Sequence, residues 1–191
     1  ALRSSLKAHV MEIITAKTAG FCFGVKRAID IAFQIAKEKR KGIYTLGPII
    51  HNPQVVDKLK EKGIIPIENI KAKKDIRALI IRTHGIPLKL SKEISLKGYE
   101  IIDATCPFVK KAQYYAKLLS EEGYQVIILG EKNHPEVKSL MSYVIDNAIV
   151  IDGKTSLPKL RSRVGIVVQT TQPIDVLKKV LSEAIVHAKE I

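Results

Sequence analysis

The chain contains 191 residues, of which 46% are apolar and 27% are charged, a composition typical of folded globular proteins. It has no uncharged apolar run long enough to span a bilayer, and residues 1–10 lack the continuous apolar stretch of a secretion signal. The formal net charge of +13 favours anionic ligands, but aromatic residues make up only 5% of the chain, which disfavours a groove for single-stranded nucleic acid. We therefore expect phosphate-bearing small molecules, rather than membranes or nucleic acid, as partners.

Short β-rich runs alternate with longer runs of helical periodicity along the chain. The predicted helices, several of which begin at a Pro or end at a Gly, span residues 25–40, 53–62, 87–97, 107–122, 135–144 and 173–189. The predicted strands span residues 12–16, 43–46, 78–82, 99–102, 125–129, 148–151 and 164–168. Strands that alternate with helices through short connections are typical of parallel sheets flanked by helices, so we predict an α/β fold.

The sequence repeats itself. Residues 22–28 and 106–112 both follow the pattern C-x-x-V-K-(K/R)-A. Two further landmarks return in the same order and at nearly the same spacing, so that His51 corresponds to His134 and His84 corresponds to Thr170. Packing alone does not require Cys and His to stay in register between two copies. The repeat therefore indicates a site built between two equivalent units.

The repeat also predicts the domain organisation. It divides the chain into a first α/β unit at residues 11–103 and a second at residues 104–191, preceded by an extension or expression remnant at residues 1–10. A third copy would carry its Cys at about the point where the sequence stops. We therefore expect either that the parent protein is longer and carries a third unit, or that another chain completes the site.

The repeated polar residues share one structural position, because each of them follows a predicted strand and precedes a predicted helix. They are Cys22, Cys106, His51, His134, His84 and Thr170. In parallel α/β sheets this carboxyl edge is where ligands bind. Helix N-termini at that edge offer free N–H groups to phosphate and lower the pKa of a cysteine thiol.

The two cysteines are candidate metal ligands. A chain with two cysteines and no export signal is typical of a reducing, cytoplasmic environment, where thiolates bind metals more often than they form disulfides. Cys22 and Cys106 with His51 and His134 offer the donors of a Cys₂His₂ zinc site, although the short spacings of structural zinc sites are absent. An iron–sulfur cluster requires three or four thiolates, so a third Cys ligand would come from outside this chain.

Imidazole and hydroxyl groups from His51, His84, His134 and Thr170 suit an anionic diphosphate, because they donate hydrogen bonds and imidazole gains charge near neutral pH. Glu136 lies two residues after His134, where it either complements the helix dipole or acts as a general acid. The first unit has Gln54 or Val55 at the corresponding place, and this asymmetry favours a catalytic role for Glu136.

At these residues the sequence resembles the 4-hydroxy-3-methylbut-2-enyl diphosphate reductase family of the non-mevalonate isoprenoid pathway. The motifs that carry the resemblance are AGFCFGV at 19–25, GPIIHN at 47–52, THG at 83–85, DATCP at 103–107, NHPEV at 133–137 and QTT at 169–171. The resemblance implies a trefoil of three α/β units around a central 4Fe–4S cluster that receives one Cys from each unit. This chain would supply the first two units.

The same resemblance implies roles for individual residues. Cys22 and Cys106 match two of the cluster ligands, and Glu136, with His134, matches the proton-delivering group. The residues that match the binding site for the substrate are His51, His84, His134 and Thr170. The implied reaction removes an allylic hydroxyl with two electrons from a ferredoxin- or flavodoxin-like donor, and the chain alone would be inactive or weakly active.

Two alternatives remain open from the sequence. One is an α/β module that binds phosphate or nucleic acid without redox chemistry. The other is a Cys₂His₂ zinc enzyme.

Overall fold

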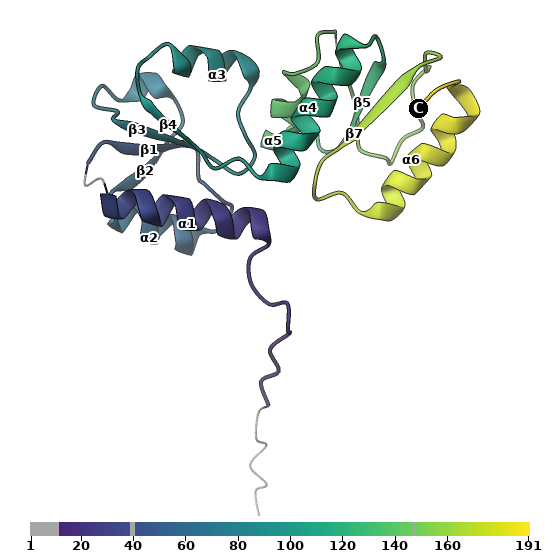
Figure 1. The fold of residues 1–191 in the computed structure, drawn as a ribbon. Helices are drawn as coiled ribbons and strands as arrows, with labels where there is room; N and C mark the ends of the chain where they lie inside the picture. The colour runs from purple at the N-terminus through teal and green to yellow at the C-terminus, as the bar shows by residue number, and fades with distance from the viewer. Residues whose placement is uncertain (1–11, 39–40, 147) are drawn as a thin grey trace, which may run out of the picture.

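The structure is a computed structural model that describes residues 12–38, 41–146 and 148–191. The extension predicted at residues 1–10 lies outside the described residues. Residues 12–16 have no regular secondary structure, so the strand predicted there is wrong. Ile13 and Ile14 are each 83% exposed, and this stretch runs away from both sheets (Figure 1). A β-rich run forms a strand only where a partner strand or a core receives it.

The first sheet has four parallel strands in the order β2-β1-β3-β4. The strands are β1 (Ile43–Leu46), β2 (Ile64–Ile67), β3 (Ala78–Ile81) and β4 (Glu100–Asp103). Helices α1 (Phe23–Glu38) and α2 (Pro53–Glu61) cover one face, α3 (Leu88–Ser95) covers the other, and a 3₁₀ turn η1 (Ile70–Ala72) follows β2 (Figure 1). Parallel strands need such crossovers, so each one ends at the same edge of the sheet.

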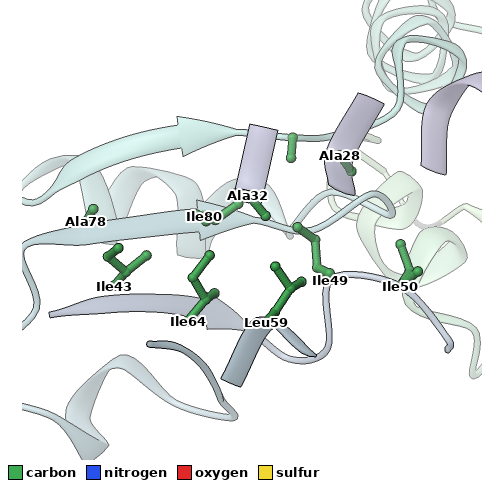
Figure 2. Close-up of a cluster of buried hydrophobic side chains, with 10 residues drawn as sticks. Ala28, Ala32, Ile43, Ile49, Ile50, Leu59, Ile64, Ala78 and Ile80 are labelled. Carbon is green, nitrogen blue, oxygen red and sulfur yellow. The ribbon is translucent and has the colours of Figure 1, made fainter. Parts of the chain in front are cut away.

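Small side chains let α1 pack closely on this sheet. Ala28 and Ala32 of α1 are fully buried against β-branched residues of the strands, among them Ile43 and Ile80 (Figure 2). Leu59 of α2 completes this layer of the core. The two central strands β1 and β3 are buried at every position, because helices cover both faces of the sheet there, which explains their mostly apolar character.

The second sheet has three parallel strands in the order β6-β5-β7. The strands are β5 (Gln125–Leu129), β6 (Ile149–Ile151) and β7 (Val164–Val168). Helices α4 (Pro107–Glu121) and α5 (Pro135–Met141) cover the face towards the first sheet, and α6 (Ile174–His187) covers the other face (Figure 1). Among the described residues, no helix combines the length and apolar character needed to cross a bilayer.

The prediction of an α/β fold with parallel sheets is confirmed, and most predicted elements agree with the structure to within three residues. Strand β2 was not predicted. It is short, lies at the edge of the sheet and contains Pro66, which lacks the N–H that a central strand would donate. Its counterpart β6 in the second sheet has no Pro and was predicted.

Contacts between the loop after β3 and helix α5 fix the two sheets relative to each other. The backbone N–H of Leu88 donates to Ser142 Oγ at 2.9 Å. The buried Ser139 Oγ donates to the carbonyl of Ile86 at 3.0 Å and accepts from Gln113 Nε2 at 2.8 Å. These bonds hold the segment after His84 against the helix that begins after His134.

Candidate active site

Three loops bring three imidazoles together. His51 follows β1, His84 follows β3, and His134 is the N-cap residue of α5, which follows β5. The ring centroids are 4.9 Å apart for His51 and His84, 5.0 Å for His84 and His134, and 6.3 Å for His51 and His134. We call these three residues the imidazole cluster. The first two histidines come from neighbouring strands of one sheet and the third from the other sheet, as the repeat predicted.

Two glycines shape the loops that carry His51 and His84. Gly47, directly after β1, has a φ of +69°, and Asn52 then caps α2 by accepting from the N–H of Val55. Gly85, next to His84, also has a φ of +69°, and a Cβ there would lie 2.4 Å from Gln113 Nε2. Only glycine suits both the left-handed backbone and this close approach.

Within the imidazole cluster, the side chain of His84 is neutral near physiological pH. Burial lowers the pKa of His84 to about 4, and the neighbouring His134, His51 and Arg82 charges act in the same direction. A neutral imidazole offers one N–H donor and one acceptor. His134 Nδ1 accepts from the N–H of Glu136 at 3.2 Å, so neutral His134 carries its proton on Nε2. The cluster therefore offers imidazole N–H donors to an incoming anion.

Glu136 and Thr170 form a second part of the site, beside the imidazole cluster. Glu136 is only 1% exposed, yet it belongs to the first turn of α5, directly after His134 and Pro135. Its Oε1 accepts from the backbone N–H of Thr170 at 2.7 Å, and its Oε2 lies 2.9 Å from the hydroxyl of the same residue. A buried carboxyl group is thus joined to an exposed hydroxyl that can meet a ligand.

The two cysteines occupy matching positions at the starts of two helices. Cys22 directly precedes α1, and Cys106 is the N-cap residue of α4. The carbonyl of Cys22 accepts from Lys26 and that of Cys106 accepts from Lys110, so each begins its helix with the same hydrogen bond. Both thiols are free, with Cys22 exposed and Cys106 partly buried.

These two helix starts meet. A Cβ built on Gly24, in the first turn of α1, would lie 2.4 Å from Cys106 Sγ. Arg27 also donates to the carbonyl of Thr105 at 3.2 Å. The N–H of Cys106 donates to the carbonyl of Thr83, the residue before His84, which places the cysteine pair next to the imidazole cluster. The predicted gathering of cysteines and histidines at one edge is therefore present.

The spacing of the donor atoms does not support the Cys₂His₂ zinc alternative. Among the described residues, the imidazole cluster forms the one set of three or more side chains spaced to hold a metal ion, with ligand atoms within 4.8 Å of one another. Neither cysteine belongs to that set. Two thiols at adjoining helix N-termini suit a metal centre that takes its remaining protein ligand from elsewhere.

Three polar residues of the site were missed from sequence. Gln113 and Ser139 are buried on the core-facing sides of α4 and α5, where they bond to each other. Arg82 directly follows β3, and its Nε is buried with no hydrogen-bond partner among the described residues. The sequence signal for Gln113 and Ser139 was a polar residue on an otherwise apolar helix face. The signal for Arg82 was a cation at the end of a buried strand. Both signals need tertiary contacts for their interpretation.

One well-formed hollow of the described part of the chain does not contain the imidazole cluster. It has a volume of about 720 Å³ and lies at the carboxyl edge of the second sheet, on the β6 side. It is lined by Gly130, Asp152, Gly153 and Thr171 among others, and none of the predicted site residues belongs to its lining. The imidazole cluster lies instead where the two sheets meet, with His51 exposed and His84 and His134 half-buried.

Comparisons with known proteins agree on one family. Residues 13–191 match the family model described as LytB protein. The 4-hydroxy-3-methylbut-2-enyl diphosphate reductase of Pelobacter propionicus is 47% identical over 183 residues, which are 95% of this chain and 65% of the relative. The reductase of Clostridium perfringens is 44% identical over 181 residues, which are 94% of this chain and 64% of the relative.

Two solved structures share the fold. A structure of (E)-4-hydroxy-3-methyl-but-2-enyl diphosphate reductase, described as the terminal enzyme of the non-mevalonate pathway, is 43% identical with a TM-score of 0.79. The match spans 93% of this chain and 65% of the chain in that structure. The E-1-hydroxy-2-methyl-but-2-enyl-4-diphosphate reductase of Plasmodium falciparum is 30% identical with a TM-score of 0.80, over 92% of this chain and 57% of that one.

The chain spans about 65% of the length of the curated relatives that it matches. The match to the family model covers nearly all of the chain, and it includes both cysteines, the imidazole cluster, Glu136 and Thr170. By this match the chain belongs to the LytB protein family.

Proposed function

We propose that the chain supplies two α/β units of an iron–sulfur oxidoreductase that converts 4-hydroxy-3-methylbut-2-enyl diphosphate to isopentenyl and dimethylallyl diphosphates. The observation that carries the proposal is the junction of the cysteine pair with the imidazole cluster through Thr83 and His84. The names of the relatives at 42–47% identity support the same activity. The proposed units are residues 11–103 and 104–191, with residues 1–10 as an extension.

The proposed cofactor is a 4Fe–4S cluster held by Cys22 and Cys106. These cysteines are the two in the sequence, and a third thiolate would come from outside this chain. When bound, the cluster supplies electrons and an iron Lewis acid for the departing oxygen. We place the protein in the cytoplasm, where a ferredoxin- or flavodoxin-like donor would provide the electrons.

The imidazole cluster would bind the diphosphate. His51, His84 and His134 donate N–H groups at distances from one another that a diphosphate can bridge, and Thr170 adds a hydroxyl. An anion next to His84 favours its protonated form, opposing the burial that lowers its pKa to about 4. Substrate binding would therefore draw a proton into the site.

Glu136 would deliver a proton to the departing hydroxyl. The overall step breaks the allylic carbon–oxygen bond, consumes two electrons and two protons, and releases water. The Glu136 carboxyl bonds to the Thr170 hydroxyl, and that hydroxyl is the group through which a proton can reach the substrate oxygen. The Thr170 N–H fixes the other carboxyl oxygen, so the donor stays oriented.

The proposal is tested by anaerobic reconstitution with iron and sulfide. We would compare this chain with a version extended by the remaining unit of the Pelobacter propionicus relative, about 100 residues at typical domain size. We expect viologen-coupled reduction of the diphosphate substrate in the extended protein, and its loss in Cys22→Ser and Cys106→Ser variants that keep their far-UV circular dichroism. Full activity in either cysteine variant would refute the proposed ligand set.

A further inference from the structure

We propose that Arg82 determines the charge preference of the imidazole cluster: its partly buried guanidinium is a fixed positive charge that favours an anion, and disfavours a cation, beside His84. The inference rests on the proposed function for the identity of that anion as a diphosphate. Arg82 acts through the electrostatic field at the cluster, so it is a specificity residue and does not itself take part in proton or electron transfer.

The first argument is that Arg82 lacks a compensating charge. Its Nε is buried with no hydrogen-bond partner among the described residues. The ion pairs found within residues 12–38, 41–146 and 148–191 do not include Arg82. Burial lowers the pKa of Arg82, but a guanidinium stays protonated at neutral pH because its ordinary pKa is above 12. A partly buried cation without a partner is costly unless a ligand neutralises it.

The second argument is its position at the base of the two loops that carry His51 and His84. Arg82 directly follows β3 and precedes His84 by two residues. A Cβ built on Gly47 would lie only 2.7 Å from Arg82 Nη1, so the guanidinium reaches the end of the neighbouring strand β1. Gly47 begins the loop that carries His51. The fixed charge therefore lies at the base of both loops of the first sheet that form the cluster.

The third argument is the electrostatic effect on the cluster. Arg82 is one of the charges that, together with burial, His134 and His51, favour neutral His84. A positive charge that opposes protonation of an imidazole also opposes the binding of a metal cation to it, and it attracts an anion. The spacing of the three imidazoles alone would suit a divalent cation. The charge of Arg82 shifts the preference towards an anion.

The repeat provides an internal comparison. The segments 81–87 and 167–173 correspond, so that Arg82 aligns with Val168 as His84 aligns with Thr170. Val168 ends β7 as an ordinary strand residue. The second unit places the carboxyl group of Glu136 near this edge, whereas the first unit places a cation there. The two halves of the site thus differ chemically, with a guanidinium in the first and a carboxyl group in the second.

The test separates a charge effect from a packing effect. Arg82→Met replaces the guanidinium with an apolar chain of similar length, and Arg82→Lys keeps the charge. Arg77→Met is the matched control, since Arg77 is exposed and lies just before the other end of the same strand. All variants are made in a Cys22→Ser, Cys106→Ser background so that added zinc reports on the histidines. Inorganic pyrophosphate and Zn²⁺ are titrated separately by calorimetry at one ionic strength.

We expect Arg82→Met to weaken pyrophosphate binding about tenfold, the lower end for a charged interaction, and to strengthen Zn²⁺ binding. Arg82→Lys should retain the order of the two affinities, and Arg77→Met should change neither. Because a partly buried cation with an unsatisfied Nε is removed, Arg82→Met should melt at or above the temperature of the parent chain.

Other results would overturn the inference. If Arg82→Met weakened both probes, melted well below the parent or failed to fold, Arg82 would be a structural residue. If it matched Arg77→Met, Arg82 would have no influence on the site. An absence of pyrophosphate binding in the parent chain is a different failure, because it would count against the anion site of the proposed function itself.

Discussion

Gly85 offers the sharpest test of how the site is assembled, because it is both conformationally special and tightly enclosed. Its φ is +69°, and a Cβ on it would meet Gln113 Nε2 at 2.4 Å and Ser139 Oγ at 3.3 Å. In Gly85→Ala the left-handed backbone costs about 1 kcal/mol. Displacing the bonded Gln113 side chain adds about 1 to 3 kcal/mol for overpacking. We expect a loss of about 3 kcal/mol in the free energy of unfolding, measured by urea denaturation.

Gly98→Ala is the matched control. Gly98 has a φ of +70°, but nothing lies within 4 Å of a Cβ built on it. This variant should lose only the backbone cost of about 1 kcal/mol. The difference between the two variants isolates the packing of the loop after His84 against α4 and α5. Equal losses would show that Gly85 is needed only for its backbone conformation, and the proposed docking of this loop would be wrong. Pyrophosphate binding should weaken in Gly85→Ala and remain unchanged in Gly98→Ala.

Three further predictions concern the bonds and charges of the site. Ser139→Ala should lower the free energy of unfolding by about 1 to 3 kcal/mol because Gln113 loses a buried partner, whereas the exposed Ser95→Ala should lower it by less than about 0.5 kcal/mol in the same urea assay. Glu136→Gln should reduce the reductase activity of the extended, reconstituted protein by about 100-fold or more with pyrophosphate affinity nearly unchanged, and equal activity would exclude Glu136 as the proton donor. The pKa of His84 is about 4 in the folded chain, against an ordinary value of 6.5 for histidine, so the unfolded chain binds the proton first and stability must fall as the pH drops from about 6.5 to about 4. In His84→Gln this loss of stability at low pH should be smaller by about 1 to 2 kcal/mol, after allowance for solvent screening. The measurement is urea denaturation of the parent chain and the variant at several pH values, and the same pH dependence in both would contradict the prediction.

Much of the fold was predictable because the sequence marks its element boundaries. Gly63 and Gly123 follow helices at the predicted places, and continuous apolar runs such as β5 are typical of strands covered on both faces. The failures have a physical cause. Strand β2 was missed because Pro66 is unusual within a strand. The run at residues 12–16 has the composition of a strand but does not pair with either sheet.

The candidate site was predictable only in part. The histidines and cysteines could be found because the repeat placed identical chemical groups after equivalent strands. Gln113 could not be found in this way, because its role depends on a hydrogen bond to Ser139, which lies 26 positions further along the chain. The charge of Arg82 likewise gains significance only when the structure shows that nothing among the described residues neutralises it.

Duplication explains why the site exists, and divergence explains what it can do. Two copies of one α/β unit bring matching sheet edges together, which gathers the thiols of Cys22 and Cys106 and the imidazoles at one junction. The two copies differ at this junction, because the first carries the guanidinium of Arg82 and the second carries the carboxyl group of Glu136. A ligand with an anionic end and a hydroxyl end then has one favourable orientation, because its charge is attracted by the first side and its hydroxyl needs the proton donor of the second.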